Sequence, residues 1–209
     1  MFKTIHSLFD SFDINKPFNF KFSIMKKLTY SVSTIVTFLV LLINSLSIHS
    51  QTTYTVINGS SETSLSGPLY GYYNYGLCQN IYLSSEIGSV AGSITSLQWE
   101  WDGTTQDAKT IKIYMGNTSK TSFSSTSDYV TSSNLTLVYD GTVSYSGASW
   151  YTITLDQPFD YSGGNLVICT DNNTAAYSSG TNKRFKSSNV GTNRTLYYYS
   201  DIYNQSVTD

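Results

Sequence analysis

The 209-residue chain carries few charges and many aromatic rings: 12% of its residues are charged, and it contains 18 Tyr, 10 Phe and 14 Gly. Both histidines, His6 and His49, lie within the first 50 residues, which excludes imidazole as a base or metal ligand from the remainder. That remainder holds 7 Lys or Arg and 12 acidic residues, a formal charge of −5. This charge argues against nucleic-acid binding, because phosphates require clustered basic side chains.

The first predicted element is a secretory signal peptide over residues 25–50. It begins with Lys26 and Lys27, continues with an apolar run over residues 35–43, and ends in small polar residues. The apolar run is shorter than the roughly 20 residues of a membrane-spanning helix, so we expect export with cleavage. The localisation predicted is therefore secreted or at the cell surface. The alternative is a chain that stays tethered to the membrane by an uncleaved segment over residues 28–48.

Two further segments complete the predicted organisation. Residues 1–24 precede the signal peptide, although a signal peptide normally begins the chain. We therefore interpret residues 1–24 as a gene-model extension and expect translation to start at Met25. Residues 51–209 have the size of one domain, which is either complete or part of a longer chain.

The two cysteines, Cys78 and Cys169, both follow the signal peptide and would enter an oxidising compartment. Two cysteines allow only one pairing, so Cys78 with Cys169 is the candidate disulfide. The alternative is that both are small buried residues, as unpaired cysteines often are. The sequence does not give the separation of the two residues in space, and both alternatives stay open.

Strands are predicted after residue 51 because apolar and polar residues repeatedly alternate. Three segments place apolar side chains on one face: Leu97, Trp99 and Trp101; Ile111, Ile113 and Met115; Tyr151, Ile153 and Leu155. Residues 166–169 are apolar at consecutive positions, which predicts a central strand covered on both faces. The other candidate strands are residues 54–57, 80–84, 135–139, 142–145, 184–186 and 195–200.

The connections between these strands are rich in turn-forming residues. Asp140 and Gly141 give the best hairpin signal, although a bulge within one long strand would use the same glycine. Residues 118–130 are rich in Ser and Thr and predict a long loop or a single helical turn. With no helical periodicity elsewhere, the fold class predicted is all-β: a two-sheet β-sandwich of jelly-roll type with about nine or ten short strands.

Several phrases occur in an order that resembles a known kind of module. They are YGYYNYGLCQNIYLSSEIG, ITSLQWEW, IKIYMGNTSKTSFSSTSDYV, LTLVYDGTV, WYTITLDQPFDYSGGNLVICTDNNT and RTLYYYSD. Together they resemble a β-sandwich module of secreted, multi-domain Bacteroidetes surface proteins. Such modules often accompany fibronectin-type or immunoglobulin-like repeats and a sorting signal for type IX secretion. The resemblance covers most of residues 54–201 and implies export and a role in surface structure or adhesion.

A run of tyrosines, LYGYYNYG, supplies the candidate ligand-binding residues: Tyr70, Tyr72, Tyr73, Tyr75 and Asn74. Tyr combines an apolar ring with a polar tip, which suits stacking on sugars, and Asn74 could bond their hydroxyls. In a strand, however, the two-residue period would send Tyr70 and Tyr72 to one face and Tyr73 and Tyr75 to the other. We expect one pair to pack in the core and the other to form the surface. The same division would apply to residues 197–199.

Acidic residues suggest two further sites, neither of which we favour. Glu100 and Asp102 lie two residues apart on one strand face, but glycoside hydrolysis requires two carboxyl groups across a cleft. Structural calcium is conceivable because Asp102, Asp140, Asp171, Asn172 and Asn173 offer oxygen ligands. Calcium takes six to eight oxygens, and no compact loop supplies them, so turn formation is the preferred interpretation. No cofactor or metal is therefore predicted.

Three functions remain after these considerations. The first is an exported, non-catalytic β-sandwich module for surface structure or adhesion, and the second is a carbohydrate-binding module that uses exposed tyrosines. A secreted glycan-active hydrolase is third, because no nucleophile with a partner base and no metal-ligand cluster is evident after residue 50. Glycans or surface proteins are the expected partners, and nucleic acid is not. We do not expect an integral membrane protein after cleavage, and the oligomeric state is left open.

Overall fold

The computed structural model describes residues 52–56, 67–178 and 184–207. All but residue 52 belong to one compact unit, Thr53–Asp209. The expected extension and signal peptide, residues 1–50, lie outside the described residues. No helix within the described ranges is both long enough and apolar enough to cross a membrane.

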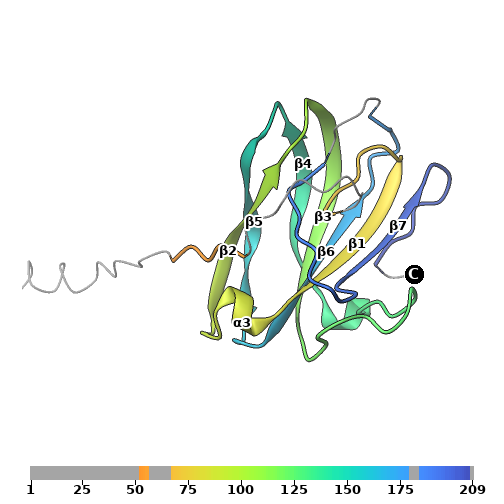
Figure 1. The fold of residues 1–209 in the computed structure, drawn as a ribbon. Helices are drawn as coiled ribbons and strands as arrows, with labels where there is room; N and C mark the ends of the chain where they lie inside the picture. The colour runs from red at the N-terminus through yellow and green to blue at the C-terminus, as the bar shows by residue number, and fades with distance from the viewer. Residues whose placement is uncertain (1–51, 57–66, 179–183, 208–209) are drawn as a thin grey trace, which may run out of the picture. The chain divides into compact units, whose positions relative to one another are not determined.

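The described residues form a mostly β structure of two antiparallel sheets (Figure 1). The strands are β1 (Tyr75–Tyr82), β2 (Gly92–Trp101), β3 (Gln106–Thr118), β4 (Thr136–Tyr145), β5 (Ser149–Tyr161), β6 (Asn165–Asn172) and β7 (Thr195–Ser200). Five strands make one sheet in the order β4-β3-β6-β1-β7, and β2 pairs with β5 in the other. One helical turn, α3 (Ser84–Ile87), follows β1, and a 3₁₀ turn, η1 (Ser132–Asn134), precedes β4. The β class predicted from the sequence is confirmed.

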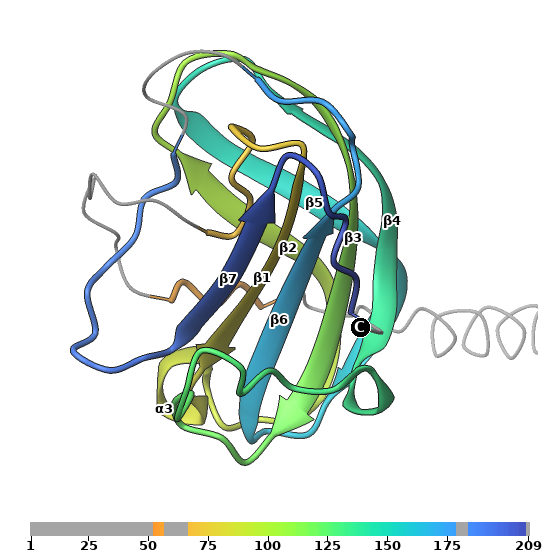
Figure 2. The ribbon, with the colours of Figure 1, turned by 90° about the vertical axis from the view of Figure 1, so that its right-hand side faces the viewer.

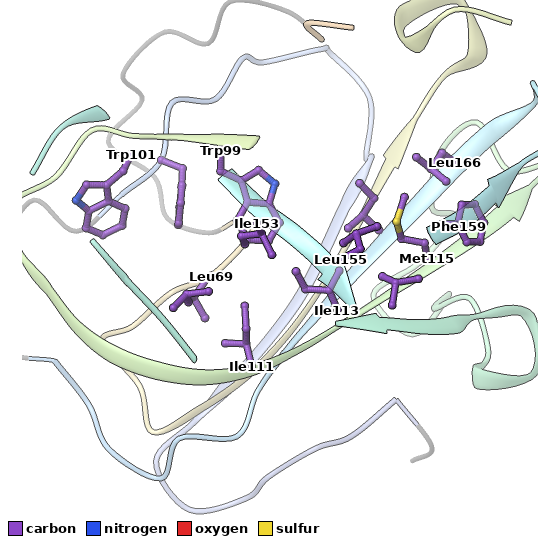
Figure 3. Close-up of a cluster of buried hydrophobic side chains, with 14 of the residues drawn as sticks. Leu69, Trp99, Trp101, Ile111, Ile113, Met115, Ile153, Leu155, Phe159 and Leu166 are labelled. Atoms are coloured by element: carbon purple, nitrogen blue, oxygen red, sulfur yellow. The ribbon is translucent and has the colours of Figure 1, made fainter. Parts of the chain in front are cut away.

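The main hydrophobic core lies between the two sheets (Figure 3). Ile111, Ile113 and Met115 on β3 are fully buried. They share this core with Trp99 and Trp101 from β2 and with side chains from β4, β5 and β6. The indole of Trp101 stacks on the ring of Tyr145 at a centroid distance of 4.9 Å, and its N–H donates to the carbonyl oxygen of Thr104. The three alternating segments therefore face inward as predicted.

A second, smaller core covers the opposite face of the five-stranded sheet. Phe123 and Val130, from the loop after β3, pack over Ile81, Val167 and Leu196. This loop explains why β6 is buried on both faces, as its unbroken apolar run predicts. The polar side chain of Gln79 is buried beneath this loop, where both ends of its amide are hydrogen-bonded. It donates to the carbonyl oxygen of Val130 at 2.9 Å and accepts from the N–H of Val130 at 2.8 Å.

The hairpin predicted at Asp140 and Gly141 is wrong. Both residues lie inside β4 and pair in regular register with Lys112 and Ile111, so residues 135–139 and 142–145 belong to one region of extended chain. The two register shifts of the β3–β4 pair fall elsewhere, between Gln106 and Lys109 and between Ile113 and Tyr114. A Cβ at position 141 would come within 2.6 Å of the Tyr139 hydroxyl oxygen, so a larger residue here would displace the end of the Tyr139 side chain.

The strand count also differs from the prediction of nine or ten, because the described residues form seven. Residues 54–56 are not in a strand, and Ile57 lies outside the described residues. Residues 184–186 contribute only an isolated bridge between Phe185 and Trp101. The Phe185 ring nevertheless lies in the main core, with its centroid 4.9 Å from that of the Trp101 ring.

Candidate binding surface

Five tyrosine rings gather beside the N-terminal end of β1 and the C-terminal part of β7, two strands that lie side by side (Figures 1 and 2). The tyrosine cluster consists of Tyr70, Tyr72, Tyr73, Tyr197 and Tyr199. Its neighbouring centroids are 5.1–5.9 Å apart. Such spacings are typical of aromatic pairs in contact. Segments more than 120 residues apart in the sequence therefore build one aromatic surface.

Tyr199 connects the two halves of the tyrosine cluster. It lies opposite Gly76 in the β1–β7 ladder, and a Cβ at position 76 would lie only 2.8 Å from its ring. The ring of Tyr199 therefore rests directly on the backbone of β1. From there it stacks on Tyr73, with an interplanar angle of 5°, and on Tyr197, with an angle of 20°.

The expected alternation of the tyrosine run is wrong for residues 70–73. These residues precede β1, and the chain turns at residues 71–74, so the two-residue period of a strand does not apply. Tyr70, Tyr72 and Tyr73 consequently contact one another instead of facing opposite sides of a sheet. Tyr75 begins β1, and the pleat places its side chain on the face opposite Gly76 and Tyr199.

The turn is tied to the body of the domain by polar groups. The carbonyl oxygen of Gly71 accepts a 2.8 Å bond from the N–H of Ser178, whose hydroxyl accepts a 2.7 Å bond from the amide of Gln106. A Cβ at Gly71 would lie 2.4 Å from the Gln106 amide nitrogen, so a side chain there would have to displace this buried amide. These bonds fix the backbone between Tyr70 and Tyr72.

Asn74 has a structural role in this arrangement. Its side-chain amide donates to the carbonyl oxygen of Asp201 at 2.9 Å, and its backbone N–H donates to the Asp201 carboxylate at 3.2 Å. Its own carbonyl oxygen accepts a bond from Asn172. The predicted ligand-binding residue thus holds the tyrosine turn against the segment that follows β7.

The tyrosine cluster is partly open to solvent. Tyr72 and Tyr197, at its two ends, are 49% and 48% exposed, while Tyr70, Tyr73 and Tyr199 are half-buried. Burial raises the pKa of Tyr70, and the neighbouring hydroxyls of Tyr73 and Tyr72 raise it further. Tyr72 and Tyr197 therefore leave about half of their surface open to solvent, and a tyrosine hydroxyl can both donate and accept a hydrogen bond.

Comparison with known proteins gives no relative. No protein-family model, no curated protein and no solved structure matches the chain.

Cys78 and Cys169 are buried and are not joined by a disulfide. They lie on the neighbouring strands β1 and β6, where Cys78 is opposite Thr170 and Cys169 is opposite Gln79. Because successive side chains alternate between faces, the two thiols point to opposite sides of the sheet. Burial raises the pKa of Cys78 to about 12 and raises that of Cys169 as well.

Two of the acidic candidates form ion pairs. The Asp102 carboxylate lies 3.6 Å from the Nε of Arg184 and 3.8 Å from the Nζ of Lys186, and the Asp140 carboxylate lies 3.6 Å from the Nζ of Lys112. Glu100 faces Trp150 across the β2–β5 ladder.

The remaining oxygen-ligand candidates point in different directions. Asp171 and Asn172 are successive residues of β6 and therefore face opposite sides of the sheet. The side-chain oxygen of Asn173 accepts a hydrogen bond from Asn204. Across the described parts of the chain, no group of three or more His, Cys, Asp or Glu side chains is arranged to hold a metal ion.

Sequence reasoning identified three members of the tyrosine cluster but did not place Tyr197 and Tyr199 beside them. The signal that could have found them is Gly76. A glycine that closes a tyrosine run, within a segment that reads as a strand, often marks a close approach of another group to the backbone. The second tyrosine run, at residues 197–199, was the obvious source of that group.

Proposed function

We propose that this protein is an exported, non-catalytic β-sandwich module that serves surface adhesion and makes contact through the tyrosine cluster. The observation that carries the proposal is the gathering of five tyrosine rings from two distant segments on one surface. Two of these rings are about half exposed. Tyrosine is enriched where proteins bind partners because one side chain supplies both apolar area and a hydrogen-bonding tip.

The non-catalytic and exported parts of the proposal rest on the sequence. Both histidines precede residue 50, and residues 25–50 have the parts of a cleavable signal peptide. The order of phrases that resembles surface modules points in the same direction. Localisation at the cell surface or in the medium follows from these features.

We also propose that the two sheets form a sandwich of jelly-roll type. The support is the path of the chain, which changes sheet between β1 and β2, β2 and β3, β4 and β5, and β5 and β6. Repeated crossings between two packed sheets are typical of Greek-key and jelly-roll folds. An experimental structure with the eight strands and two Greek keys of a jelly roll would support this classification.

A glycan is one candidate ligand of the tyrosine cluster, and a surface protein is the other. The half-exposed rings of Tyr72 and Tyr197 favour the glycan. The C–H face of a sugar ring is apolar and its rim carries hydroxyls, which matches the two parts of a tyrosine side chain.

The test is binding of the purified protein to an array of glycans and extracellular surface proteins. Tyr72→Ala and Tyr197→Ala should each weaken binding, because each removes an exposed ring of the cluster. Trp150→Ala is the matched control, since this residue is 48% exposed but lies on β5 of the other sheet. Binding that persists in both tyrosine variants, or that is lost in Trp150→Ala, would contradict the proposal.

A further inference from the structure

We infer that the tyrosine cluster is an oxidation site, at which Tyr73 and Tyr199 become joined as dityrosine within one chain. The oxidant is a peroxide acting through an external peroxidase, which withdraws electrons from phenols one at a time. This inference goes beyond the proposed function, because it assigns a covalent modification to the cluster and requires no ligand. It rests on the parallel stacking of these two rings, on the contacts that hold them and on the exposed rings beside them.

The reaction removes one electron and one proton from each of the two phenols. Each hydroxyl loses its hydrogen and leaves a phenoxyl radical, whose unpaired electron is shared between the oxygen and the ortho and para ring carbons. The two radicals then pair their electrons in a new bond between one ortho carbon of each ring. Both of these carbons lose their hydrogen as a proton, and both oxygens regain one, so the phenols are restored. The peroxide takes up the two electrons and two protons and leaves as two water molecules.

The rings of Tyr73 and Tyr199 have the orientation that this bond requires. Their planes differ by 5°, the smallest angle among the ring contacts of the cluster, and their centroids are 5.7 Å apart. The unpaired electron of a phenoxyl radical occupies the π system, whose lobes stand perpendicular to the ring, so parallel rings direct these lobes toward each other. Stacked rings touch at about 3.5–4.0 Å, so this larger centroid distance means that the rings are offset and overlap at their edges. The ortho carbons lie on those edges.

Both rings are held in place by the backbone around them. Tyr199 lies directly on Gly76, where a Cβ would come within 2.8 Å of its ring. Tyr73 precedes Asn74, whose side-chain amide and backbone N–H both donate to Asp201. The segments that carry the two rings are thus bonded to each other. Because the rings are already neighbours, coupling inside one molecule should outpace coupling between copies, which depends on collisions.

The half-exposed rings give the oxidant access to the cluster. Tyr72 is 49% exposed and Tyr197 is 48% exposed. Tyr72 contacts Tyr73 at a centroid distance of 5.4 Å, and Tyr197 stacks on Tyr199 at 5.1 Å. A radical formed on an exposed ring can take an electron from the neighbouring phenol, which moves the radical inward. Oxidation at the surface therefore reaches Tyr73 and Tyr199, although both are half-buried.

The experiment is oxidation of the purified protein with hydrogen peroxide and a plant peroxidase, followed by mass mapping of its peptides. We expect a monomer with dityrosine fluorescence, and a linked pair of peptides carrying Tyr73 and Tyr199 that is lighter than the two separate peptides by two hydrogen atoms. Tyr73→Phe and Tyr199→Phe should each abolish this pair, since phenylalanine keeps the ring but has no phenol to oxidise. The matched controls are Tyr177→Phe and Tyr203→Phe, which should leave its yield unchanged. These two tyrosines are 62% and 69% exposed, but neither contacts another aromatic ring among the described residues.

The cross-link should also raise thermal stability. It joins residues more than 120 positions apart, and closing so long a loop lowers the entropy of the unfolded chain. The Tm of the oxidised protein should rise by roughly 10 °C, whereas that of oxidised Tyr199→Phe should not rise.

Four results would overturn the inference. They are no dityrosine in the folded protein, dityrosine only between copies, a link that maps to a different pair of tyrosines, and a linked pair that is lost in Tyr177→Phe or Tyr203→Phe. None of these results bears on the proposed function, because the array measures binding by the protein before oxidation. Absence of tyrosine-dependent binding on the array would refute the proposed function and leave the cross-link in place.

Discussion

Replacement of Gly76 by alanine tests whether the tyrosine cluster is packed as the structure places it. The new Cβ would lie 2.8 Å from Cδ1 and 3.2 Å from Cε1 of Tyr199. Carbon atoms in contact prefer about 3.5–4.0 Å, so the ring would have to move by several tenths of an ångström at least. Its contacts with Tyr70, Tyr73 and Tyr197 oppose such a shift.

The expected magnitude follows from two opposing terms. Inserting a methyl group into a packed site costs about 1–3 kcal/mol. Gly76 has no positive φ, so alanine can adopt its backbone conformation and lowers the entropy of the unfolded chain, which offsets about 0.4–1 kcal/mol. We expect a net loss in the free energy of unfolding of about 1–2 kcal/mol. For a domain of this size, the Tm should fall by about 2–8 °C.

Thermal and urea unfolding of Gly76→Ala and Gly92→Ala provide the assay. Gly92 is also a strand glycine without a positive φ, but a Cβ at that position would meet nothing within 4 Å. Gly92→Ala should therefore leave stability unchanged or raise it slightly. If Gly76→Ala proved as stable as Gly92→Ala, with an unchanged near-ultraviolet tyrosine signal, the Tyr199 ring would not lie on Gly76, and the reasoning would be refuted.

Three other predictions concern the body of the domain. Glu86→Gln breaks the ion pair with Arg194, whose guanidinium nitrogens lie 2.6 and 2.8 Å from the carboxylate oxygens, and should cost about 1–3 kcal/mol in urea unfolding at pH 7. Hydrogen bonds from Arg194 hold the pKa of Glu86 below its ordinary value of 4.5, so this difference should be complete above pH 4.5 and disappear as the pH falls further; a pH-independent difference would contradict it. Because burial raises the pKa values of Cys78 and Cys169, neither thiol should react with a disulfide reagent at pH 8 until urea is added, and dithiothreitol should not change the Tm. Met115→Ala should lower the unfolding free energy by about 2–5 kcal/mol, because the side chain is fully buried between the sheets; a change below 1 kcal/mol would argue against that placement.

The parts of the fold that the sequence predicts are those decided by local pattern. Ile111, Ile113 and Met115 alternate with polar residues, and a half-buried strand must place them on one face. The apolar run at the start of β6 likewise predicts burial on both sides. In each case the information lies within a few neighbouring residues.

What the sequence does not predict depends on contacts between distant residues. Asp140 and Gly141 have the composition of a turn, but pairing with β3 keeps them extended. Gly71 and Asn74 bend the chain before β1, and their bonds to Ser178 and Asp201 decide where the tyrosine rings go. The pattern of alternating faces failed at this turn because nothing local marks the residue at which the strand begins.

The unequal width of the two sheets explains why the tyrosine cluster forms at this edge. Pairing places Gly76, Tyr197 and Tyr199 on the same face of the five-stranded sheet as Ile111, the face that bears the main core. The opposing sheet has only two strands. The buried side chains that the five-stranded sheet contributes to the main core come from β3, β4 and β6. The inner face of β1 and β7 is covered instead by residues 67–73, which bring three tyrosines with them. Aliphatic residues would suffice if this edge had only to be buried, whereas rings left half exposed with their hydroxyls are suited to contact with a ligand.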